Sequence, residues 1–211
     1  MVDKLSIFNG ALVYLGEREI ASLTEDRAPV RHLENVWKQK FIDNVLSEGQ
    51  WVFATRSLRL EADSGIVPAY GYEYAFGLPD DFLNFCSVCS DENGHNPVLR
   101  YVIENNHVFT DYDTIYISYI SNGTGYGGDF DKWSPQFLDY VICKLAYKAC
   151  MVISQSNTDR NFMRQESERL RKIALNQDAR LKPTKIPAET GWSRSRRGGR
   201  GYSGLYHGER Y

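Results

Sequence analysis

Apolar residues recur at steps of three and four in two segments near the amino terminus. In residues 3–17 the stripe ends at Gly16, which predicts one helix. In residues 29–48 the same spacing predicts a second helix, with Pro29 in its first turn and Thr24 or Asp26 as a cap. We expect the two helices to pair as a hairpin. The apolar positions are Leu5, Phe8, Leu12 and Leu15, then Val30, Leu33, Trp37, Phe41 and Val45.

The period changes in the middle of the chain. Residues 54–124 contain short aromatic and β-branched runs separated by turn formers such as "LPDD", "DENGHNP" and "NN". These runs predict an antiparallel meander. Within residues 115–120 apolar and polar positions alternate, so one face of that strand is expected to pack on the helices and the other to meet solvent or a partner.

The helical period returns after residue 133. Ser134 and Pro135 are a cap and a first helical residue, and Ser156 with Asp159 has the spacing of a capping box for a further helix. In that last helix four apolar residues are expected to point inward: Phe162, Met163, Leu170 and Ile173. Beyond about Lys182 no period survives, and the Gly, Ser, Arg and Tyr composition predicts a segment that orders only on a partner.

Composition limits the class of protein. The chain has 211 residues, 42% of them hydrophobic, which is enough for one core of ordinary size. It contains no run of about 18 apolar residues and no leader with a cleavage site, so we expect a soluble protein that is neither secreted nor membrane-spanning, with no membrane among its partners. The net charge of −2 hides an asymmetry, because residues 179–211 carry eight Lys or Arg against two Glu. An acidic body of charge −8 therefore precedes a tail of charge +6.

The four cysteines are interpreted as reduced structural thiols. The pair Cys86 and Cys89 has the C-x-x-C spacing of a metal or redox site, but on a strand this offset places the thiols on opposite faces. Cys143 and Cys150 lie in an apolar helical stretch, where cysteine behaves as a small hydrophobe. We expect no metal.

A glycine-rich segment raises the possibility of a nucleotide site. Gly123, Gly125 and Gly128 have the G-x-G-x-x-G spacing, yet "DFDKW" separates them from the next helix, and no carboxylate stands about 20 residues on. We interpret the segment as a strand-to-helix connector and expect no cofactor. The four histidines have no metal spacing, and the carboxylate pairs "PDD" and "DYD" are typical of turns. The sequence predicts a protein that is not an enzyme.

An ordered series of phrases resembles a known family. The phrases are "ALVYLGEREIASLTED", "EGQWVFATRSLRL", "YAFGLPDDFL", "YVIENNHVFTDYDTIYISYI", "SPQF" with "KLAYKAC", and "NQDA". Together they are similar to the tail tubular protein A family of short-tailed bacteriophages, over residues 4 to about 179. The resemblance implies a structural virion protein at the head-tail junction, made in the host cytoplasm. It implies a head-to-tail adaptor ring of 12 copies between the portal protein and the nozzle, tail tubular protein B, with DNA passing through the lumen without sequence-specific binding.

The expected fold is α+β. An antiparallel helical bundle of about four helices, residues 1–53 and 130–178, would carry a β-rich meander insertion, residues 54–129, and an extended, basic C-terminal tail, residues 179–211. The acidic body would suit a channel that must not hold DNA by its phosphates, or the acids would simply solvate the outer surface. Turns of the insertion are the expected contact with the nozzle.

The tail combines arginines with aromatic anchors. Docking on the portal is the favoured role, through Trp192, Arg194, Arg196, Arg197, Arg200, Tyr202, Leu205 and Tyr206. The same residues could grip DNA through phosphates and stacking, or have no role. The alternative function is therefore a nucleic-acid-binding module that uses the Arg, Gly and Tyr-rich tail.

Overall fold

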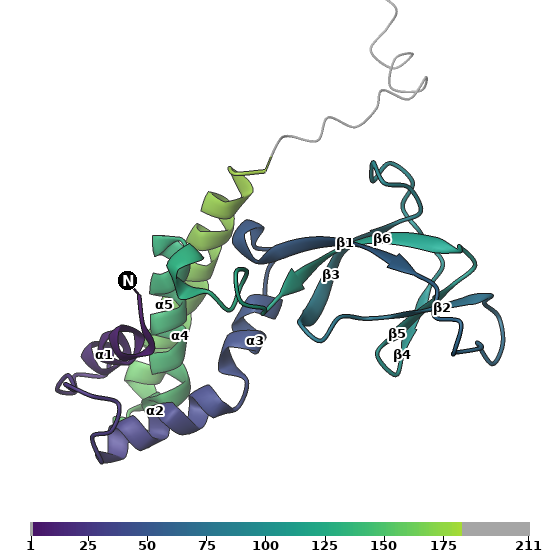
Figure 1. Ribbon diagram of the computed structural model, residues 1–211. Coiled ribbons are helices and arrows are strands. Elements are labelled where there is room, and N and C mark those ends of the chain that lie inside the picture. The colour runs from purple at the N-terminus through teal and green to yellow at the C-terminus, as the bar shows by residue number, and fades with distance from the viewer. Residues whose placement is uncertain (1, 183–211) are drawn as a thin grey trace, which may run out of the picture. The chain divides into compact units, whose positions relative to one another are not determined.

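The structure, a computed structural model, describes residues 2–182. The described chain is mixed α+β, with five α-helices and two three-stranded antiparallel sheets (Figure 1). The helices are α1 (Lys4–Tyr14), α2 (Ala28–Lys38), α3 (Phe41–Ser47), α4 (Pro135–Ile153) and α5 (Asn157–Ala179). The strands are β1 (Thr55–Glu61), β2 (Tyr74–Gly77), β3 (Phe82–Cys89), β4 (Val102–Glu104), β5 (His107–Thr110) and β6 (Thr114–Ser121). Two 3-10 turns flank the strands in the sequence: η1 (Val52–Ala54) precedes β1, and η2 (Phe130–Lys132) lies between β6 and α4.

The first helix forms where the stripe predicts it. Asp3 caps α1 by accepting the backbone N–H of Ser6, and the chain turns at Gly16 with a positive φ of 71°. At Gly10 the helix lies so close to α4 that a Cβ would come within 2.9 Å of Ile142. The glycine therefore sets how near α1 packs to α4.

The second predicted helix, residues 29–48, is wrong as a single element. The chain forms α2 and α3 instead, separated at Lys40, which has a left-handed φ of 56°. The break turns the second half of the apolar stripe, so that Phe41 and Val45 reach the same core as Leu33. Neither Thr24 nor Asp26 caps α2, whose N-cap is Arg27 without a side-chain hydrogen bond.

The last two helices begin at the predicted caps. Ser134 accepts the N–H of Phe137 at the start of α4, and Ser156 accepts the N–H of Asp159 at the start of α5. Inward packing on α5 is confirmed for Met163 and, in part, for Leu170. The prediction of inward packing is wrong for Phe162, whose exposed fraction is 63%, and for Ile173. The buried face of α5 is instead a narrow stripe that includes Ser167 and Ala174.

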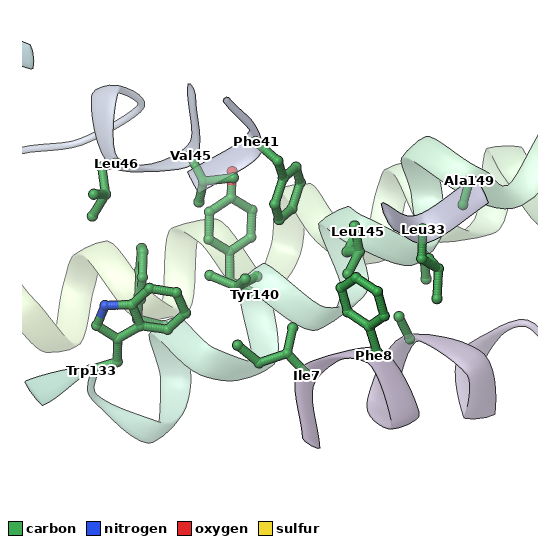
Figure 2. Packing of buried hydrophobic residues seen from close by; sticks show 14 of the residues in the cluster. Ile7, Phe8, Leu33, Phe41, Val45, Leu46, Trp133, Tyr140, Leu145 and Ala149 are labelled. Atoms are coloured by element: carbon green, nitrogen blue, oxygen red, sulfur yellow. The ribbon is translucent and has the colours of Figure 1, made fainter. Parts of the chain in front are cut away.

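One hydrophobic core joins all five helices. Figure 2 shows Phe8 of α1, Leu33 of α2, Phe41 of α3 and Tyr140 of α4 converging on it. Aromatic rings continue it toward the sheets. Phe137 stacks edge-on against Trp51 of the segment before β1, with ring centroids 4.6 Å apart, and against Trp133 at 5.0 Å.

The strands pair as two sheets in the orders β1-β6-β3 and β2-β5-β4. This differs from the predicted meander, because only β4 and β5 are neighbours both in the chain and in a sheet. The alternation in β6 is present, but its apolar face does not pack on the helices. Ile115, Ile117 and Tyr119 instead share a second core with Phe76 and Val108 of the other sheet, because that sheet covers them.

No helix within residues 2–182 has both the length and the apolar character that spanning a membrane requires.

Candidate interaction surfaces

A polar junction joins the first sheet to the glycine-rich segment. Asp81, in the turn before β3, accepts hydrogen bonds from Arg56 of β1 at 2.9 Å and from the Tyr119 hydroxyl of β6 at 3.0 Å. Its carboxylate also accepts the Ser121 hydroxyl, and its carbonyl accepts the N–H of Asn122. One carboxylate therefore fixes both outer strands of this region to the chain that leaves β6.

The protonation of this junction follows from its geometry. Burial raises the pKa of Asp81, but hydrogen bonds from Ser121, Arg56 and Tyr119 outweigh it and hold the pKa below its usual value. Burial and the hydrogen bond to the Asp81 carboxylate raise the pKa of Tyr119 to about 12. The carboxylate is ionised and the phenol is neutral at pH 7, which suits a structural network. The sequence reading of "PDD" as turn chemistry missed this role.

The glycine-rich segment is a close-packed turn. A Cβ on Gly127 would lie 2.5 Å from the Ser121 carbonyl, and one on Gly128 would lie 2.3 Å from the Asn122 carbonyl. The amides of these glycines donate within the turn, to the carbonyls of Ser121 and Gly123, and the Trp133 indole N–H donates to the Gly127 carbonyl. A phosphate-binding loop must present its amides to the ligand, so this geometry favours the connector interpretation.

A second, half-buried network lies at the edge of the helical core. The Tyr140 hydroxyl and the Lys144 ammonium both contact the Glu48 carboxylate at the end of α3, the ammonium at 3.1 Å. Burial and the hydrogen bond to Glu48 raise the pKa of Tyr140 above its usual value. Arg171 of α5 donates to the Glu48 carbonyl at 3.3 Å. These groups tie α3, α4 and α5 together.

Within residues 2–182 no group of three His, Cys, Asp or Glu side chains is placed to hold a metal ion. Cys86 and Cys89 lie on β3 as predicted; Cys86 packs against the helical core, whereas Cys89 lines the outer face of the first sheet. Burial raises the pKa of Cys143 to about 11, which keeps this thiol protonated at neutral pH.

The second sheet carries a groove on its outer face. We name it the outer groove; its volume is about 480 Å³, and it lies between the loop of residues 66–72 and strands β4 and β5. Its principal lining residues are Val67, Tyr70, Tyr72, Val102, Glu104 and Phe109. Val67 is 86% exposed and Tyr70 is 89% exposed, which is unusual for side chains of this size.

Arg100 holds the two walls of the outer groove together. Its guanidinium donates to the Gly71 carbonyl at 3.2 Å and lies 5.3 Å from the centre of the Tyr72 ring. It also pairs with Asp111 at 3.5 Å, so its own charge is partly neutralised. These contacts of Arg100 therefore stabilise the shape of the groove. No single sequence motif predicts it.

The net negative charge of the chain is concentrated in the sequence that contains the two sheets. Residues 54–129 contain 3 Arg and 11 Asp or Glu, a net charge of −8. The helical part, which we define as residues 2–53 and 130–182, contains 16 Lys or Arg and 14 Asp or Glu. The charge asymmetry of the sequence therefore lies between the negative β-rich part, residues 54–129, and the positive tail.

The predicted portal-docking residues lie outside the described part of the chain: Trp192, Arg194, Arg196, Arg197, Arg200, Tyr202, Leu205 and Tyr206.

Comparison with known proteins leaves the family open. No protein-family model matches the chain, and no curated protein is significantly similar to it.

Proposed function

We propose that this chain is a structural head-to-tail adaptor of a short-tailed bacteriophage, a ring subunit between the portal and the nozzle. The observation that carries the proposal is a set of large apolar side chains in the β-rich part that are almost fully exposed. Val67, Tyr70 and Leu99 are each at least 86% exposed, and such surface is typical of subunits that bury it on partners. The ordered series of phrases that resembles the tail tubular protein A family supplies the identity of the assembly.

In this proposal the helices act as an antiparallel bundle that carries the β-rich part as an insertion. Lateral contacts between neighbouring subunits would use the apolar residues that the helical part leaves exposed, among them Val13, Met151, Val152 and Phe162. The turns of the β-rich part would meet tail tubular protein B. Twelve copies would surround the DNA, which passes without sequence-specific contacts, and the protein would have no catalytic role.

The basic tail would dock on the portal. Aromatic side chains would fill portal pockets while the arginines pair with portal acids, a division of labour typical of protein interfaces. A tail that grips DNA instead would make the chain a nucleic-acid-binding module. The +6 charge of residues 179–211 favours this second candidate, whereas the −8 charge of the preceding residues opposes it.

The experiment is native mass spectrometry of this protein mixed with the portal ring encoded in the same genome. Full-length chain is compared with a chain ending at Lys182, which retains all of α5 and the contact of Asp178 with the Val52 N–H. A variant with Arg194, Arg196, Arg197 and Arg200 changed to Gln keeps the length and removes four charges.

We expect a discrete addition of 12 subunits for the full chain, and its loss for the truncated and Arg-to-Gln chains. Addition that survives both changes would reject the docking role of the tail but keep the adaptor. No complex at low and moderate salt, with salt-sensitive retention of the full chain on DNA, would reject the adaptor and favour the nucleic-acid module.

A further inference from the structure

The outer groove has the chemistry to bind an extended basic and aromatic peptide. Val67, Val102 and Phe109 provide apolar walls, and Glu104 adds a carboxylate on the strand that forms one edge of the sheet. Glu73 follows directly after the groove loop in the sequence, and Glu61 and Asp63 precede it. Aromatic side chains would enter the groove while arginines pair with these carboxylates.

Residues 183–211 of this chain carry a net charge opposite to that of the β-rich part around the groove. They contain six Lys or Arg and two Glu, a net charge of +4, together with Trp192, Tyr202, Tyr206 and Tyr211. The β-rich part carries −8. We propose that the outer groove binds this C-terminal segment of the same chain.

The tether is long enough for binding within one chain. The end of α5 is fixed beside the start of the β-rich part, because the Asp178 carboxylate accepts the N–H of Val52 at 2.9 Å. From there the seven residues of β1 span about 23 Å and lead to the groove loop. The ten residues from 183 to Trp192 extend to about 33 Å, so Trp192 and the arginines after it can reach the groove.

Attachment to the same chain favours this occupant over a free partner. A covalent link of this length gives the segment an effective concentration on the order of 1 mM at the groove, so that even weak binding is populated. The inference does not depend on the adaptor function. If the adaptor proposal is also correct, the portal must displace the segment from the groove, and the exposed groove then becomes available to another partner.

The test is the rate at which trypsin cleaves the full-length, nuclease-treated chain after Arg194, Arg196, Arg197 and Arg200, followed by intact mass spectrometry. A synthetic peptide of residues 183–211 is the reference at each salt concentration. We expect cleavage about 10-fold slower than in the peptide at low salt, because proteolysis follows the population of the undocked segment. In about 0.5 M NaCl the difference should fall below about threefold, because salt screens exposed charge pairs.

Two groove variants and two matched controls locate the binding surface. Tyr70→Ser and Glu104→Lys should bring the cleavage rate close to that of the peptide. Phe162→Ser and Glu168→Lys change an exposed aromatic and an exposed acid on α5, and should leave the protection intact. Circular dichroism of each variant confirms that it remains folded.

Cleavage of the full chain at the peptide rate would overturn the proposal, as would protection that the groove variants leave unchanged. Protection that increases with protein concentration would place the segment on a second copy and overturn binding within one chain. The native mass experiment with the portal can succeed or fail independently of these results.

Discussion

The helical part and the β-rich part each have a buried core, but the most exposed large side chains lie in the β-rich part. In the helical part the rings of Trp51, Phe137 and Tyr140 are fully buried and in contact with one another. In the β-rich part Tyr70 and Leu99 are about nine-tenths exposed. The first arrangement stabilises the subunit by removing apolar area from water, whereas the second leaves that gain to be made on binding. The comparison suggests that stability and recognition are separated along this chain.

The largest expected effect tests this separation with one substitution in each part. Trp51→Ala should lower the free energy of unfolding by about 4 kcal/mol, because it removes a buried ring and leaves a cavity. In a chain that ends at Lys182, Tyr70→Ala should change it by less than about 0.5 kcal/mol, because there the side chain is exposed to water. Chemical denaturation followed by circular dichroism measures both. A similar loss for the two variants would show that Tyr70 belongs to a core and would end the comparison.

Two glycine substitutions compare the turn that contacts the helical part with a strand of the second sheet. Gly127→Ala should cost about 3 kcal/mol, because the new methyl group would overlap the Ser121 carbonyl and Leu46. Gly77→Ala in β2 meets only ordinary contacts with His107 and should stay within about 0.5 kcal/mol of the parent. Thermal unfolding of the two variants side by side measures the difference. Equal effects would mean that the glycine-rich turn yields to the methyl group.

The polar junction should give a smaller, pH-dependent effect. Asp81→Asn should cost about 2 kcal/mol at pH 7, because a charged acceptor of three side-chain hydrogen bonds is lost. Since the folded pKa lies below the unfolded value near 3.9, the carboxylate stabilises the fold at pH 7 and loses this contribution as the pH falls through the folded pKa. The difference between parent and variant should therefore shrink between about pH 5 and pH 3.

The neighbouring residue provides the control for this pH dependence. Asp80 is exposed, and Asp80→Asn should stay within about 0.5 kcal/mol of the parent across the same range. Urea denaturation at a series of pH values measures all three proteins. A deficit for Asp81→Asn that stays constant from pH 7 to pH 3 would contradict the ionised network.

Local signals in the sequence predicted the elements but not their arrangement. The caps at Ser134 and Ser156 were predictable because a cap and its partner lie within three residues. The break at Lys40 was not, because a left-handed lysine leaves no mark in the apolar period. The strand order was not predictable either, because β1 pairs with a strand more than 50 residues away, and such pairing depends on tertiary packing.

The candidate surfaces were hidden for the same reason. Asp81 takes its partners from 25 to 40 residues away, so its role appears only when three strands have assembled. The outer groove is built from a loop and two later strands joined by Arg100, and its residues form no motif in the sequence. What the sequence did indicate was the charge asymmetry, which needs only counting, and which the structure then located on one part of the molecule.

The smallest effect concerns the Tyr119 hydroxyl, which connects the core of the β-rich part to the polar junction. Tyr119→Phe should cost about 1 kcal/mol at pH 7, because the ring still fills its site and one hydrogen bond is lost. The pKa of Tyr119 is raised to about 12, so the neutral phenol stabilises the fold below about pH 10 and this contribution is lost as the pH rises through the folded value. The deficit of Tyr119→Phe should therefore shrink between about pH 10 and pH 12, and Tyr116→Phe, on the opposite face of β6, is the control for the loss of a tyrosine hydroxyl. A deficit for Tyr119→Phe that persists in alkali would mean that the hydroxyl acts by packing alone, and that the junction is held by Arg56 and Ser121.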